Sequence, residues 1–253
     1  MTVIMGTIMP KVKTFIAKHV LEVRFKEKNF KFLDFYGELI DALHSATDFE
    51  KVKVENAGAR IEVASADYSK TYFFSLENFG FQIDAETDIE SFKTHVSKLL
   101  AFVGNFQKFE LKDILRIGTK SSFFCHIPSR PEEGLRQIFF NKLFANKSAF
   151  ESTTGLEITD IAFTYFDAKS GDVKSNILTG PSNLEEAISR YFQKPKLYSG
   201  FNQKAGVFYD IDTYSENLGK LTSAELNSKI ATQIGVIEKS FTGYMDLFNE
   251  KTK

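Results

Sequence analysis

Residues 205–213 decide the architecture of the C-terminal half, and the chain reads there Ala205-Gly206-Val207-Phe208-Tyr209-Asp210-Ile211-Asp212-Thr213. The run is rich in β-branched and aromatic residues and ends in apolar–polar alternation, which is typical of a strand. Thr222 and Glu225 follow with the spacing of a capping box at the start of a helix. The apolar stripe of that helix repeats at helical spacing: Leu226, Ile230, Ile237, Phe241, Tyr244 and Phe248. This half therefore predicts a strand followed by a long C-terminal helix.

The same order occurs earlier in the chain. Residues 80–84 read Gly-Phe-Gln-Ile-Asp, and a capping box at Thr87 and Glu90 opens a second amphipathic helix. Two such units predict an α+β fold of two similar lobes, each an antiparallel sheet backed by helices. Prolines at positions 128 and 131 place the boundary between residues 1–128 and 129–253. No flexible linker divides the halves, so one continuous domain is the alternative.

The remaining elements follow from the same patterns. Further strands are expected at residues 20–25, 51–55, 59–65, 71–76, 111–127, 156–166 and 173–179. Further helices are expected at residues 29–45, 132–145 and 182–192, with Asn29 capping the first and Ser182, paired with Glu185, capping the last.

Composition limits the class of protein. The 253 residues carry 32 basic and 33 acidic side chains, which argues against a globally basic nucleic-acid binder. Basic and aromatic residues do alternate in residues 11–31, but a strand with one solvent-exposed face and one buried face explains this pattern. We therefore expect no nucleic-acid partner. Cys125 is the one cysteine, so no intrachain disulfide can form and a reducing, cytoplasmic location is expected. No apolar run reaches the length of a membrane span.

The best candidate for catalysis is the pair Asp210 and Asp212, which alternation places on one strand face, where two carboxylates could hold Mg²⁺. The run resembles the first motif of haloacid-dehalogenase-type phosphatases, although Tyr214 stands where that motif has threonine. A metal-dependent hydrolase is therefore the alternative function. We expect instead that the pair is not a catalytic metal site, because the sequence places no further ligand beside it.

Other chemistry is not expected. Cys125 and His126 are adjacent on a strand and so point to opposite faces, which prevents a nucleophile–base pair. Phosphate-binding glycine motifs and paired-histidine metal motifs are missing from the sequence. We therefore predict no catalytic residues, no metal and no cofactor.

Two stretches resemble a sporadically distributed family of uncharacterised bacterial proteins. The first is Arg116-Ile117-Gly118-Thr119-Lys120 and the second is Asp210-Ile211-Asp212, near the final helix. The family has no established activity. Its patchy occurrence is similar to that of phage-defence genes, so the resemblance implies a bacterial protein that acts as the sensor of an antiphage defence system, with an effector protein as its partner.

A recognition surface is predicted on residues 132–145 and their continuation. In helical projection Leu135, Phe139 and Leu143 form the stripe that should face the core. A second face is aromatic at its centre and basic at its ends, and it consists of Arg136, Phe140, Phe144 and Lys147. This composition is favoured at protein interfaces. The sequence thus predicts a non-enzymatic recognition or adaptor module with a protein partner; packing of the two rings between the lobes is the alternative.

Overall fold

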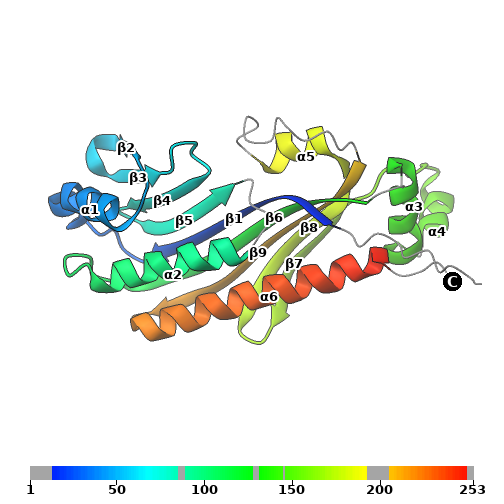
Figure 1. The fold of residues 1–253 in the computed structure, drawn as a ribbon. Coiled ribbons are helices and arrows are strands. Elements are labelled where there is room, and N and C mark those ends of the chain that lie inside the picture. The colour runs from blue at the N-terminus through cyan, green and yellow to red at the C-terminus, as the bar shows by residue number, and fades with distance from the viewer. Residues whose placement is uncertain (1–12, 85–88, 128–130, 145, 193–204, 250–253) are drawn as a thin grey trace, which may run out of the picture.

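One antiparallel sheet of nine strands forms the centre of the molecule (Figure 1). The computed structural model describes residues 13–84, 89–127, 131–144, 146–192 and 205–249. The strands are β1 (Lys13–Phe25), β2 (Lys51–Glu55), β3 (Arg60–Ala64), β4 (Lys70–Ser75), β5 (Asn78–Asp84), β6 (Ile114–His126), β7 (Phe163–Ser170), β8 (Val173–Asn183) and β9 (Ala205–Gly219). The helices are α1 (Phe32–Ala46), α2 (Ile89–Asn105), α3 (Glu132–Leu143), α4 (Lys147–Thr154), α5 (Leu184–Tyr191) and α6 (Ser223–Asn249), with a 3₁₀ turn, η1, at Asn56–Gly58.

The strand order shows two similar halves around a central pair. The order is β2-β3-β4-β5-β1-β6-β9-β8-β7, so β1 and β6 lie side by side at the middle. In each half the central strand leads to helical segments, then to strands that step back toward the centre, and finally to a helix, α2 or α6. The predicted α+β fold, with an antiparallel sheet backed by helices and a long C-terminal helix, is confirmed.

The two halves share their sheet across the predicted boundary. Strand β6, which the sequence assigned to residues 1–128, pairs with β9 of the other half from Ile114 to His126. By strand order β6 opens the second half in the way that β1 opens the first. The continuous sheet therefore favours the alternative of one domain, and the division at 128/129 stays a prediction.

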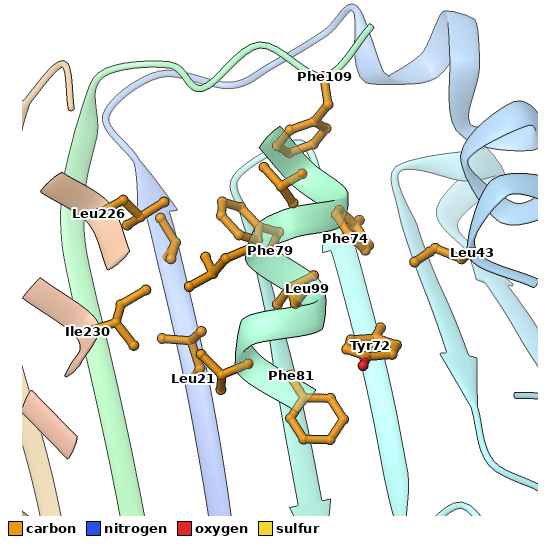
Figure 2. Close-up of a cluster of buried hydrophobic side chains, with 14 of the residues drawn as sticks. Leu21, Leu43, Tyr72, Phe74, Phe79, Phe81, Leu99, Phe109, Leu226 and Ile230 are labelled. Carbon is orange, nitrogen blue, oxygen red and sulfur yellow. The ribbon is translucent and has the colours of Figure 1, made fainter. Parts of the chain in front are cut away.

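One face of the sheet carries the main core. Helices α1, α2, α3 and α6 cover it, and α2 and α6 run side by side (Figure 1). Lys93 of α2 and Glu238 of α6 join the two helices through an ion pair of 2.7 Å. Phenylalanine supplies much of the core volume, and Phe74, Phe79 and Phe81 are completely buried beneath α2 (Figure 2). We call this side of the sheet the helix face.

The predicted helix caps had mixed outcomes. The capping box at α6 is confirmed, because Thr222 N donates to Glu225 Oε2 at 2.8 Å and Glu225 N donates to Thr222 Oγ1 at 3.2 Å. The cap of α5 was wrong by one residue, since Asn183 Oδ1 accepts the backbone N–H of Glu186.

The cap predicted for the first helix was wrong. No side chain caps α1, which begins at Phe32 rather than directly after Asn29. The box predicted before α2 includes Thr87, which lies outside the described residues. Among the helices of the described ranges, none is both long and apolar enough to cross a membrane.

Candidate functional site on the open face of the sheet

The helices that the structure describes cover the second face of the sheet at just one of its ends. Helix α5 packs there on Ile16, Phe124 and Phe208, on the side opposite α2 and α6 (Figure 1). Beyond α5 the strands present charged and polar side chains, and we call this region the open face. Its central patch lies on β1, β6 and β9 and consists of Glu22, Arg24, Arg116, Lys120, Asp210, Asp212 and Tyr214.

Asp210 and Asp212 lie on this patch, and each is paired with a base. Arg116 Nη2 donates to Asp212 Oδ2 at 2.6 Å. Lys120 Nζ lies 3.0 Å from Asp210 Oδ2, and the hydroxyl of Ser122 donates to the other oxygen of Asp210. The two stretches that carry the family resemblance are therefore neighbours in space, although residues 121–209 separate them in the chain.

This pairing bears on the hydrolase alternative. A Mg²⁺ ion binds carboxylates whose charge is not already balanced by a tethered cation, and here it would have to displace Arg116 and Lys120. Within the described residues, no three His, Cys, Asp or Glu side chains form a group able to hold a metal. The geometry thus favours a charged surface over a metal centre.

Two arginines lie on neighbouring strands of the patch. Arg24 of β1 and Arg116 of β6 occupy directly opposite positions in the ladder. Arg24 Nη2 lies 2.7 Å from Glu22 Oε2, and this hydrogen bond, together with the charges of Glu22 and Asp212, raises the pKa of Arg24 despite its partial burial. Each of the two guanidinium groups is therefore held by a carboxylate.

Tyr214 is fixed beside this pair. The guanidinium carbon of Arg116 lies 4.7 Å from the centre of the Tyr214 ring, and the phenol donates a hydrogen bond to Asp167 of β7. That hydrogen bond and burial raise the pKa of Tyr214 to about 12. The ring is therefore a neutral, oriented platform for Arg116 over the whole physiological range.

Irregular backbone surrounds the same position. Leu115 is an extra residue in β6 opposite β1, directly before Arg116. Asn217 of β9 and Asp167 of β7 adopt positive φ angles, 56° and 51°, at shifts in the register of their strands. Bulges of this kind bend a strand and re-aim side chains, and they are frequent beside functional sites.

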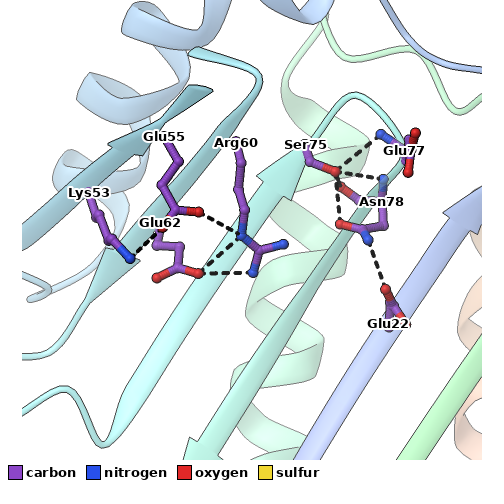
Figure 3. Close-up of polar contacts among 8 residues, drawn as sticks. All are labelled: Glu22, Lys53, Glu55, Arg60, Glu62, Ser75, Glu77 and Asn78. Atoms are coloured by element: carbon purple, nitrogen blue, oxygen red, sulfur yellow. Dashed lines mark hydrogen bonds and ion pairs between the residues drawn. The ribbon is translucent and has the colours of Figure 1, made fainter. Parts of the chain in front are cut away.

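An outer patch lies further along the open face, on β2 and β3. Arg60 binds Glu62 at 2.9 Å, and Lys53 and Glu55 form a second ion pair beside it (Figure 3). The same figure shows Asn78 donating to Glu22 at 2.8 Å, which connects β5 to the central patch. Opposite charges thus alternate across this face.

The predicted recognition surface is divided between two helices. Helix α3 ends at Leu143, so Phe144 follows it and Lys147 begins α4. The Lys147 ammonium lies 4.9 Å from the centre of the Phe140 ring, which keeps the two residues together. Phe140 is only 5% exposed, whereas Phe144 is half-buried.

The basic ends of that surface also have partners. Arg136 pairs with Glu132 at 2.5 Å and with Asp160 at 3.1 Å, and Lys147 pairs with Glu151. Little of Phe140 is left for a partner in this arrangement. Binding at Arg136, Phe140, Phe144 and Lys147 stays a prediction.

Cys125 and His126 point to opposite faces of β6. Cys125 is buried in the core of the helix face, while His126 is half-buried and its Nδ1–H donates to the carbonyl of Ala205 at 2.9 Å. The two side chains therefore do not form a nucleophile–base pair.

No model of a known protein family matches the chain, and no curated protein matches its sequence. The resemblance to the sporadically distributed bacterial family therefore stays a prediction.

Sequence reasoning missed Arg24 and Tyr214 as members of the site. Glu22 and Arg24 stand two residues apart on a strand, a spacing that places both on one face. The sequence does not show, however, that β1 lies beside β6, and only that pairing brings Arg24 to Arg116.

Proposed function

We propose that the protein is a non-enzymatic recognition module that binds a protein partner through the central patch of the open face. The observation that carries this proposal is the patch itself, where side chains from three strands are ion-paired into a fixed surface. Charged groups arranged in this way give an interface specificity and guide the approach of a partner with complementary charge.

The shape of the patch supports binding over catalysis. Gly118 stands between Glu22 and Tyr214 in the cross-strand row, and the planar guanidinium of Arg116 lies across it, so the centre of the patch is low in relief. A shallow surface of this kind suits another macromolecule, whereas small-molecule sites are concave and mostly apolar.

Quantitative affinity capture from native host cells tests this proposal. The wild-type chain is compared with Lys120→Gln/Asp210→Asn in the central patch and with Arg60→Gln/Glu62→Gln in the outer patch. Both double variants keep the net charge. We expect a partner that the wild type and the outer-patch variant capture and the central-patch variant loses. The same proteins captured by all three would contradict the proposal.

Phe140→Ala/Phe144→Ala extends this capture to the predicted surface on α3 and α4. If this variant stays folded and alone loses the partner, recognition belongs to that surface instead. Capture with and without phage infection tests the more specific hypothesis of a defence sensor with an effector partner, which rests on the family resemblance.

The hydrolase alternative has its own test. Calorimetric titration with Mg²⁺ and Mn²⁺ should show no binding at micromolar concentration, because Arg116 and Lys120 already balance the two carboxylates. Micromolar binding that disappears in Asp210→Asn would favour a metal-dependent hydrolase.

A further inference from the structure

We propose that Arg24 and Arg116 form a clamp for a carboxylate group, and that the partner presents this group on an acidic segment of its chain. The inference rests on the proposed function, because it names the chemistry that the central patch recognises.

The position of the two arginines is the first argument. Like charges on directly opposite residues of an antiparallel pair destabilise a sheet, yet Arg24 and Arg116 occupy such positions. A polar neutral residue at position 24 or 116 would serve folding equally well. Glu22 pairs with Arg24, Asp212 pairs with Arg116, and Glu216 stands opposite Arg116 on β9, so these carboxylates offset the repulsion.

The unused donors are the second argument. A guanidinium group carries five N–H donors in a planar fork. Glu22 contacts Nη2 of Arg24, and Asp212 contacts Nη2 of Arg116. Within the described residues, these contacts leave most of the donors on both arginines for a ligand. The side chains of Arg24 and Arg116 are 48% and 20% exposed, so a ligand can reach both.

The position of the Arg116 guanidinium is the third argument. The guanidinium of Arg116 lies across Gly118, and its carbon is 3.4 Å from the position that a Cβ atom would take. The missing side chain leaves room for the guanidinium to lie across the strand. Tyr214 holds the guanidinium from the other side, and a fork that is already oriented loses less entropy on binding.

The charge of the surroundings selects the ligand. Glu22 and Asp212 lie directly beside the clamp, and they repel a dianionic phosphate more strongly than a single carboxylate. A carboxylate is planar and matches the fork in bidentate geometry. An aspartate or glutamate side chain of a partner fits these conditions, and neighbouring acidic residues of the same segment would compete with Asp210 for Lys120 and with Glu216 for Lys174.

Fluorescence anisotropy with labelled peptides and the full chain tests the clamp. The probes are hexaglutamate, hexaglutamine, a peptide with a single phosphoserine among glutamines, and a thymidine 12-mer. The variants are Arg24→Gln/Glu22→Gln and Arg116→Gln/Asp212→Asn, each of which removes one base and one acid. The matched control is Arg60→Gln/Glu62→Gln, which removes the same charges from the outer patch.

We expect the wild-type chain to bind hexaglutamate and not hexaglutamine, with weaker binding at 0.5 M salt. Both clamp variants should lose at least about tenfold in affinity, and the control should stay within about twofold. Arg24→Lys/Arg116→Lys keeps the charge but not the fork, so it should lose roughly three- to tenfold. Circular dichroism of each variant verifies that it is folded.

Two results for the peptides would overturn the inference: no binding of hexaglutamate by the wild-type chain, or tighter binding of the phosphoserine peptide than of hexaglutamate. Equal losses of affinity in the clamp variants and the control variant would also overturn it. So would binding of a thymidine 12-mer by the wild-type chain as tight as that of hexaglutamate. A failed clamp leaves the proposed function standing if the Lys120→Gln/Asp210→Asn variant still loses the captured partner. Hexaglutamate binding without any partner that depends on the patch would instead support the clamp and contradict the proposed function.

Discussion

On strand β4, Phe73 and Phe74 are neighbours in sequence but lie on opposite faces of the sheet. Phe74 is completely buried on the helix face, where its ring contacts those of Phe79 and Phe109. Phe73 lies on the open face, over Gly80 and beneath the guanidinium of Arg60. The helix face is therefore closed by side chains from several elements, whereas the open face is a single layer of side chains next to solvent.

The difference between the two faces separates the residues that stabilise the fold from those of the proposed binding surface. A closed core leaves a cavity when a side chain is truncated, but a single layer lets water or a neighbouring side chain fill the space. The open face can therefore carry charged residues in the arrangement that the proposed binding requires, and we expect them to contribute little to the free energy of unfolding.

The two phenylalanines give the largest expected effect. Phe74→Ala should lower the free energy of unfolding by roughly 3–5 kcal/mol, because it opens a cavity beneath α2. Phe73→Ala should cost roughly 2 kcal/mol, the transfer contribution of the ring without a closed cavity. Urea unfolding of both variants measures the difference. Equal losses would show that the two faces are equally closed.

Two glycines in one cross-strand row give the next effect. A Cβ atom at Gly80 would lie 2.0 Å from the carbonyl oxygen of Leu21, so Gly80→Ala forces backbone to move. At Gly118 the nearest atom belongs to the Arg116 side chain at 3.4 Å, which is ordinary contact. We expect Gly80→Ala to lose roughly 1–3 kcal/mol and Gly118→Ala to lose less than half as much. The reverse order in thermal unfolding would contradict this placement of the strands.

His95 on the helix face should make stability depend on pH. Burial is the main cause that lowers the pKa of His95 to about 4, and its ring contacts the Tyr72 hydroxyl at 3.0 Å. The unfolded chain binds a proton near pH 6.5 while the folded chain does not, so stability is full above pH 6.5 and falls toward pH 4. His95→Gln should flatten the difference in urea midpoint between pH 7 and pH 5. An unchanged difference would assign the pH dependence to other groups.

The ion pairs of the open face should give the smallest change in stability. Arg116→Gln/Asp212→Asn removes a partly exposed pair, and such pairs contribute about 0–1 kcal/mol. Thermal unfolding should therefore change by a few degrees at most, in contrast to the loss of peptide binding expected for the same variant. A loss of more than about 2 kcal/mol would mean that the pair holds β6 and β9 together.

Local pattern was sufficient for most of the elements. Strand β2 occupies residues 51–55 as predicted, because apolar–polar alternation is a property of the strand itself. The capping box at Thr222 and Glu225 could be recognised in the sequence because both partners lie within four residues of the chain. The strand expected at residues 156–166 instead spans Phe163–Ser170, and Leu156 in the first part of the expected range is 65% exposed.

The sequence by itself determined the α+β class, the order of most elements and the common face of Asp210 and Asp212, because each depends on contacts between residues close in the chain. Only the tertiary structure decided that β1 and β6 are neighbours and that β6 joins both halves in one sheet. The clamp of Arg24 and Arg116 and the pairing of the two carboxylates with bases follow from that choice. Strand partners far apart in sequence are selected by the packing of the whole chain, and no local pattern specifies them.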